Sequence, residues 1–280
     1  MVAQRTIRTV LSVGAVLALL VAVSLLPPDT SLKEVETTRT LKACVPPIYP
    51  PLVTGDPEQP GIDIELLRAV AAHMGVSLQI YENHAMGRDF NPRNWNLNRA
   101  QCQVIAGGVV DSDQTRSFLE TGPAYANTGW AIVSPEPLAS IEGLNVGTLA
   151  LVSGLDRLGL ASYLRNQGVT ARVIQDPETL AAAIADGSLD AGITEAMLAT
   201  RIAEDNDWTV DWIPPPLGRY NVVFGLWKGD ITLKRAIEAA FSQLSNDGAI
   251  ADILDRYGAT PIEPGPDPAG GRAGQDETPA

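Results

Sequence analysis

An arginine that follows a short acidic run is the first feature of the sequence that could bind a ligand. Arg116 ends the run DSDQTR, in which Asp111 and Asp113 precede it, and Glu120 stands four residues further on. A guanidinium group holds a carboxylate through two parallel, charge-assisted hydrogen bonds, so Arg116 could bind an acidic group of a small molecule. It could equally form a surface ion pair with Asp111, Asp113 or Glu120. Both interpretations stay open.

Backbone groups nearby could add to such an anion site. Gly107 and Gly108 come shortly before the acidic run and have no Cβ, so their N–H groups could approach an anion closely. Ser153 stands near the expected start of a helix, where a hydroxyl and the helix N-terminus could also receive an anion. These residues favour non-covalent binding of a small polar molecule.

Motifs for covalent or metal chemistry are missing from the sequence. It contains no GxSxG, no phosphate-binding P-loop and no GxGxxG. His73 lies on an expected helix, as an exposed residue, and His84 in an expected loop, without the spacing of metal ligands. We therefore expect no cofactor, no metal and no enzyme activity.

The charge balance excludes two classes of partner. The 280 residues carry a net charge of −13, with 45% hydrophobic and 19% charged residues, as in a soluble globular protein. Nucleic acid needs basic side chains to neutralise its phosphates, and an anionic membrane surface needs them as well. We expect neither as a partner.

The first 26 residues predict export. Arg5 and Arg8 precede an uncharged apolar run over residues 10–26, the pattern of a secretory signal. Residues 1–26 are thus a signal peptide or, if uncleaved, an anchor in the inner membrane, with the rest of the chain in the periplasm. In that compartment the two cysteines, Cys44 and Cys102, most economically form one disulfide.

The folded part of the chain reads as α/β. Short apolar runs alternate with helical patterns, and the pattern starts afresh after residue 133, which suits two lobes. Residues 27–39 are polar and predict a linker. Residues 261–280 are rich in proline, glycine and acids and predict a disordered tail.

Five segments in order resemble one known family. They are GIDIELLRAVAAHMGVSLQI, CQVIAGGVVDSDQTRSF with the PAY that follows, LNVGTL, GSLDAGITEAMLA, and the long C-terminal segment that begins YNVVFGLWKGD. Their order resembles the family 3 extracellular solute-binding proteins, which are the receptors of polar amino-acid ABC importers.

The resemblance implies a type II periplasmic binding fold. Lobe 1 would comprise residues 40–132 plus 221–258, and lobe 2 residues 138–217, with hinges near residues 133–137 and 216–220. A small polar solute would bind between the lobes and be trapped when they close. The partner would be an ABC permease complex, and we expect a monomer.

The resemblance also implies roles for three side chains. Arg116 matches the arginine that holds a ligand's α-carboxylate. Glu195 lies five residues after Asp190, in the register of an aspartate that contacts the ligand's amino group, although it could instead be a helix N-terminal acid. Tyr49 matches an aromatic residue that packs on the ligand, or merely packs its proline-rich turn.

Two further positions are less regular. Trp95 is a weaker aromatic candidate that would more often pack than bind. Asp113 falls where the family has a threonine that donates to the carboxylate. A second carboxylate there would repel an anionic ligand or itself occupy Arg116, so a cationic or neutral solute becomes more credible.

Two other functions stay open. In the family's strand order the first and third strands of lobe 1 are neighbours, which would bring Cys44 and Cys102 together. A cysteine on each of these strands also resembles a subgroup associated with periplasmic quinoprotein dehydrogenases, so such a dehydrogenase is an alternative partner. The fold also includes cyclohexadienyl dehydratases, in which Glu195 and Asp113 would be acid and base.

Overall fold

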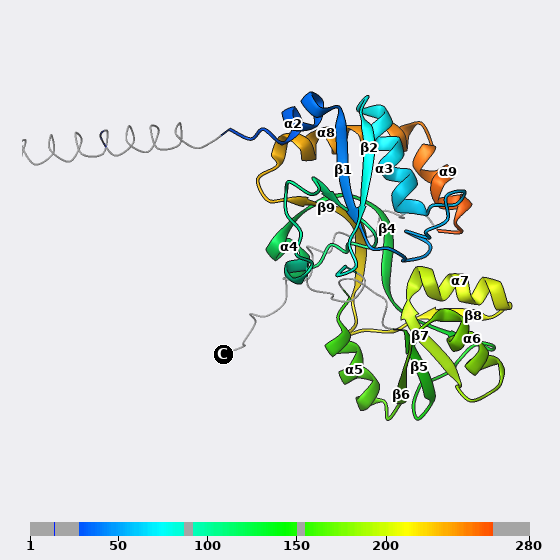
Figure 1. Cartoon of the computed structure of the whole chain (residues 1–280). Helices are drawn as coiled ribbons and strands as arrows, with labels where there is room; N and C mark the ends of the chain where they lie inside the picture. The colour runs from blue at the N-terminus through cyan, green and yellow to red at the C-terminus, as the bar shows by residue number, and fades with distance from the viewer. Residues whose placement is uncertain (1–13, 15–27, 87–91, 150–154, 260–280) are drawn as a thin grey trace, which may run out of the picture.

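The chain forms two α/β lobes that are joined by two long strands (Figure 1). The computed structural model describes residues 14, 28–86, 92–149 and 155–259. The predicted tail lies outside these residues, as does the predicted signal except for residue 14. No helix in the described ranges has the length and apolar character needed to cross a membrane.

Lobe 1 holds the N-terminal strands and the C-terminal helices. Its elements are α2 (Ser31–Thr38), β1 (Thr40–Val45), α3 (Ile62–His73), β2 (Ser77–Glu82), η1 (Pro92–Asn94), β3 (Val104–Ile105), α4 (Asp113–Phe118), α8 (Ile231–Asn246) and α9 (Ala249–Arg256). Lobe 2 is built from β5 (Asn145–Leu149), α5 (Arg157–Asn166), β6 (Thr170–Ile174), α6 (Pro177–Ala185), β7 (Ala191–Glu195), α7 (Ala196–Asn206) and β8 (Thr209–Trp212). The expected α/β class is confirmed.

Two antiparallel strands, β4 (Leu119–Ser134) and β9 (Arg219–Trp227), belong to both lobes. The strand order is β2-β1-β3-β9-β4-β7-β5-β6, and β8 also pairs with β4. β4 pairs with β9 from Leu119 to Gly129, and then with β7 from Trp130 onward. The change of partner therefore falls at residues 129–130, ahead of the predicted hinge at 133–137.

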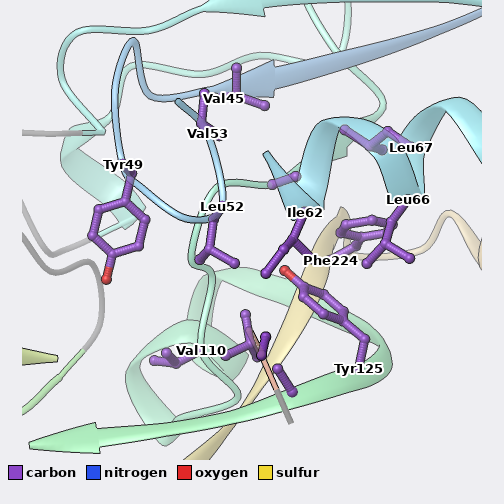
Figure 2. Close-up of a cluster of buried hydrophobic side chains, with 14 of the residues drawn as sticks. Val45, Tyr49, Leu52, Val53, Ile62, Leu66, Leu67, Val110, Tyr125 and Phe224 are labelled. Carbon is purple, nitrogen blue, oxygen red and sulfur yellow. The ribbon is translucent and has the colours of Figure 1, made fainter. Parts of the chain in front are cut away.

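Helix α3 covers lobe 1 with its apolar face. Ile64, Leu67 and Val70 are buried, as their helical spacing predicts, whereas His73 near its end is exposed. Behind the helix lie Tyr125 of β4 and Phe224 of β9 (Figure 2). Together with Phe241 of α8 they form an aromatic cluster with ring centroids 5.4–6.4 Å apart. This cluster connects the strands that cross between the lobes to the core of lobe 1.

The segment predicted as a polar linker instead contains helix α2. Val35 is completely buried, and the Ser31 and Thr232 hydroxyls lie 3.1 Å apart, which fixes α2 against the start of α8. Asp29 accepts a hydrogen bond from the Thr232 N–H at 2.6 Å. Desolvation would raise the pKa of Asp29, but the hydrogen bonds from Ser31 and Thr232 lower it below its usual value. A buried valine and the hydrogen bonds of Asp29 and Ser31 to the start of α8 therefore fix a segment that is otherwise polar.

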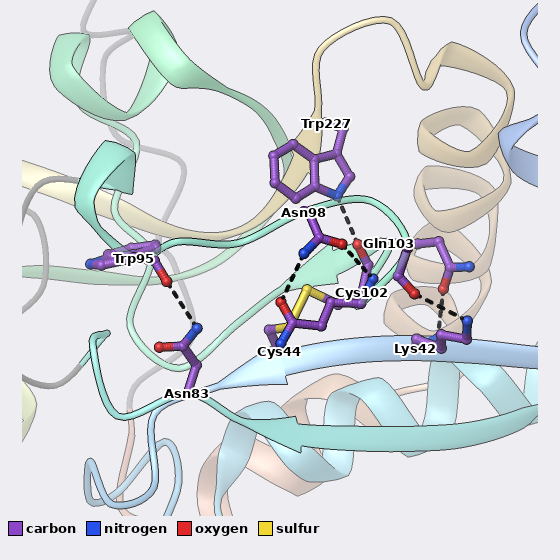
Figure 3. The surroundings of a disulfide bond; sticks show 10 residues. Lys42, Cys44, Asn83, Trp95, Asn98, Cys102, Gln103 and Trp227 are labelled. Carbon is purple, nitrogen blue, oxygen red and sulfur yellow. Dashed lines mark hydrogen bonds between the residues drawn. A yellow bond between two sulfur atoms is a disulfide. The ribbon is translucent and has the colours of Figure 1, made fainter.

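Cys44 and Cys102 form a disulfide, with Cα atoms 5.6 Å apart (Figure 3). Cys44 lies on β1, and Cys102 lies two residues before β3. β1 and β3 are parallel neighbours, as the resemblance implied. Both cysteines are buried, and the indole N–H of Trp227 donates to the Cys102 carbonyl at 2.7 Å.

The disulfide closes a loop with a sequence separation of 58 residues. Its loss should lower the free energy of unfolding by about 4 kcal/mol, because the unfolded chain regains the entropy of that loop. Urea unfolding of the Cys44→Ala, Cys102→Ala double variant measures the change. Wild-type protein unfolded with reductant is the control, since it loses the cross-link but keeps both side chains. If the free energy of unfolding fell by less than about 1 kcal/mol in both the double variant and the reduced wild type, this expectation would be contradicted.

Candidate functional site

A buried carboxylate, Asp63, organises the part of lobe 1 that faces the junction between the lobes. It lies in the first turn of α3 and is completely inaccessible to solvent. Oδ2 accepts hydrogen bonds from the N–H groups of Gly107 and Gly108, the second at 3.3 Å, and Oδ1 accepts one from the hydroxyl of Tyr125. Burial raises the pKa of Asp63 to about 6, although these hydrogen bonds favour the charged form.

Gly107 and Gly108 have backbone angles that only glycine adopts easily, with φ of 90° and 84°. A Cβ on Gly107 would overlap the ring of Pro46, and one on Gly108 would overlap the ring of Tyr49. The two glycines thus let β1 and the loop after it lie directly on the turn that follows β3. Their N–H groups, predicted to receive a ligand anion, point instead at Asp63.

Tyr49 is buried against this turn, with 5% of its surface exposed. It lies in the loop between β1 and α3, and its backbone N–H bonds to the Val53 carbonyl at 2.6 Å (Figure 2). Burial raises the pKa of Tyr49 well above its usual value, and the charges of Glu195 and Asp63 raise it further. The same two carboxylates act on Tyr125. Glu195 of lobe 2 therefore acts electrostatically on both tyrosines of lobe 1.

Glu195 is buried where β7 meets β4 and α7. It caps α7, since its carboxylate accepts hydrogen bonds from the N–H groups of Met197 at 3.0 Å and Leu198 at 3.1 Å. The hydroxyl of Thr128 on β4 donates to the same carboxylate. Burial raises the pKa of Glu195, and in the described part of the chain no cation pairs with it.

Arg116 is paired within lobe 1. Its Nε lies 2.6 Å from Oδ1 of Asp111, and its Nη2 lies 3.0 Å from Oδ2 of the same residue. Asp113 adds a longer ion pair at 3.7 Å, and its side chain is fully exposed. Ser112 caps α4 by accepting a hydrogen bond from the Thr115 N–H, so Asp113 is the first residue of that helix. Hydrogen bonding to Asp111 raises the pKa of Arg116.

The remaining candidates lie elsewhere. Trp95 is buried beside the disulfide, with its carbonyl accepting from Asn83 Nδ2 at 3.0 Å (Figure 3). Ser153 lies outside the described residues. A cavity of about 410 Å³ lies in lobe 2 between α5 and strands β5 and β6, and the predicted site residues that the structure describes are not among those that line it.

The sequence analysis missed three contributors. Asp63, Tyr125 and Thr128 make the buried hydrogen bonds around the junction, but none was a candidate. Asp63 was visible only as an acid at a helix start, which usually indicates favourable interaction with the helix dipole. Nothing in its local pattern indicated that it would be buried, because its partners come from distant strands.

Two α/β lobes joined by two strands, with polar groups buried at their junction, define a two-lobed binding protein. The sequence profile of the bacterial extracellular solute-binding proteins, family 3, matches residues 41–260. The chain belongs to this family.

The relatives agree with this assignment. The L-cystine-binding protein TcyJ of Escherichia coli (strain K12) is 21% identical over 243 residues, which cover 81% of this chain and 85% of the relative. A substrate-binding protein of an ABC uptake transporter from Streptococcus pneumoniae, solved with bound histidine, aligns with a TM-score of 0.63 and 19% identity. The alignment covers 82% of this chain and 96% of that one.

A reconstructed ancestral protein has the same architecture. AncCDT-1, an amino acid-binding protein described as a precursor of cyclohexadienyl dehydratase, aligns with a TM-score of 0.62 and 16% identity. The alignment covers 81% of this chain and 98% of that one. At such identities the solved structures establish the two-lobed, type II periplasmic binding fold, as expected from the sequence. These relatives give no support to the quinoprotein subgroup.

The unusual pKa of Asp63 predicts a pH-dependent stability. Between about pH 4 and pH 6 folded Asp63 keeps a proton that the unfolded chain releases, so stability falls as pH rises through this window. The decrease should reach about 3 kcal/mol. In Asp63→Asn, where the amide can still accept from the glycines and donate to Tyr125, this contribution should disappear.

Urea unfolding of both proteins from pH 4 to pH 7 tests this. Tyr125→Phe is a matched variant, because it removes a hydrogen bond that favours charged Asp63 and should move the decrease to higher pH. Parallel stability curves for wild type and Asp63→Asn would show that Asp63 keeps an ordinary pKa.

Proposed function

We propose that the chain is a receptor that captures a small polar, amino-acid-like solute between its lobes. It would do so in the periplasm and deliver the solute to the permease of an ABC importer. Two relatives support this role, since one is named for binding L-cystine and the other is a substrate-binding protein of an ABC uptake transporter that was solved with bound histidine. We propose a non-enzymatic protein that acts as a monomer.

The observation that carries the proposal is a buried acid without a counter-ion at the junction. Glu195 of lobe 2 accepts a hydrogen bond from Thr128 of β4, and no described cation pairs with it. Its charge also acts on Tyr49 and Tyr125 of lobe 1. A buried carboxylate is costly unless a positive group compensates it. The ammonium group of a solute would supply that charge, and Tyr49 would pack against the solute beside it.

Closure would follow from the connection between the lobes. Within the described ranges, β4 and β9 are the strands that run from one lobe into the other, near residues 129–130 and at residue 219. Small backbone changes there would rotate lobe 2 as a body, as in other hinged proteins. A permease could then distinguish the closed receptor by its shape.

A thermal-shift screen against amino acids, amines and organic acids tests the receptor function. A solute present at 100 times its dissociation constant should stabilise the protein by about 2.7 kcal/mol, which raises the melting temperature clearly. In Glu195→Gln this ligand-induced shift should fall by at least half, since the counter-charge is lost while the amide can still cap α7.

Glu142→Gln is the matched control, because Glu142 is an exposed acid of the same lobe. Its shift should equal that of the wild type. If no solute stabilises the wild-type protein, the receptor function is wrong. If a solute binds and Glu195→Gln binds it equally well, the role of Glu195 is wrong while the function stands.

A further inference from the structure

The chain's own carboxylates occupy the groups that a ligand carboxylate would need. Among the described residues, the sequence predicted three anion-binding groups, namely Arg116, Gly107 and Gly108. Arg116 forms a two-point ion pair with Asp111, at 2.6 and 3.0 Å. Both glycine N–H groups donate to Asp63. All three are therefore already satisfied from within lobe 1.

The two cases differ in how firmly the donors are held. Asp63 is completely buried. If the two glycine N–H groups turned to a ligand, this buried carboxylate would lose two of its three hydrogen-bond donors, which is costly. Arg116 is half exposed, and a solute could in principle displace Asp111 from it. The displaced Asp111 would then lie, together with Asp113, beside the incoming carboxylate, and three like charges would repel one another.

Both lobes also carry acids whose charge acts on a residue at the junction. Asp113 of lobe 1 and Asp156 of lobe 2 are both exposed, and both act electrostatically on Tyr220, which lies where β9 enters lobe 1. Glu195 is buried nearby, since it accepts a hydrogen bond from Thr128, which is the strand partner of Tyr220. It has no cationic partner among the described residues. These acids would compensate the charge of a positively charged solute. A solute carboxylate, by contrast, finds no free donor among Arg116, Gly107 and Gly108.

We propose that this receptor selects an organic amine without a carboxylate, such as a diamine or a guanidino-amine, over the corresponding α-amino acid. The inference rests on the receptor function proposed above and narrows the chemical class of its solute. Glu195 would bind the ammonium group, and the Asp111–Arg116 ion pair would exclude the carboxylate that amino acids carry.

Matched pairs of compounds that differ by one carboxylate test this directly. The pairs are agmatine and arginine, cadaverine and lysine, and putrescine and ornithine. Isothermal titration of the purified chain should give, for the pair that fits best, a dissociation constant at least tenfold lower for the amine. That ratio corresponds to about 1.4 kcal/mol.

Asp111→Asn tests the cause of the selectivity. It removes the bidentate partner of Arg116, so the affinity for the amino acid should rise at least fivefold and the preference for the amine should shrink. Asp205→Asn is the control, since Asp205 forms an exposed ion pair with Arg201 at 3.1 Å on α7 and carries the same charge. The control should keep the wild-type ratio.

The outcomes separate the two proposals. If the wild type binds an amino acid as tightly as its amine, or more tightly, the inference is wrong and the receptor function stands. If neither member of any pair binds, the inference is wrong, and the wider solute screen then decides the receptor function. If Asp111→Asn leaves the ratio unchanged, the ion pair is not the cause, and this explanation of selectivity fails.

Discussion

The hydrogen bonds that the buried carboxylate of Asp63 accepts hold lobe 1 together at the junction. Its three donors come from the turn after β3 and from β4, while the carboxylate itself comes from α3. These elements are far apart in the sequence, and the Asp63 carboxylate joins them in addition to the pairing of β3 and β4 with β9. The turn after β3 also supports Tyr49, whose ring packs against Gly108. The position of the Tyr49 ring therefore depends on Asp63, an acid that a solute need not contact.

A similar arrangement recurs at two other places. Asp111 holds Arg116, and Glu195 caps α7 while it accepts from Thr128. In each case an acid of the chain satisfies donors that could otherwise face a ligand anion. The junction is consequently rich in carboxylates and poor in free donors among the described residues. This electrostatic character, more than the shape of the fold, distinguishes the kind of solute that the receptor can accept.

Much of the fold could be predicted because its elements are locally encoded. The apolar spacing of residues 61–75 predicts α3, and the proline and glycine around residues 177–187 predict α6, since helix faces and helix ends depend on near neighbours. Helix α2 could not be predicted, because the contacts that hold it, such as that between Ser31 and Thr232 of α8, come from distant parts of the chain. The length of β4 was also hidden, since its second half is stabilised by β7 rather than by adjacent residues.

The candidate site was less predictable than the fold. Glu195, Tyr49 and Arg116 were identifiable from their place in the resemblance, but their partners were not, because hydrogen bonds such as that from Thr128 to Glu195 join residues 67 positions apart. The sequence left open whether Arg116 pairs with a ligand or with a neighbouring acid. Only the side-chain geometry identifies Asp111 as its partner.

The most direct test of this account is an NMR measurement on the Nε–H group of Arg116 in the wild-type chain. If Asp111 holds this group, its resonance should be displaced downfield and protected from solvent exchange. Addition of glycine or acetate at millimolar concentration should then leave its position unchanged. A rapidly exchanging Nε–H that shifts on addition of these carboxylates would contradict the account, since Arg116 would then be free to bind a solute anion.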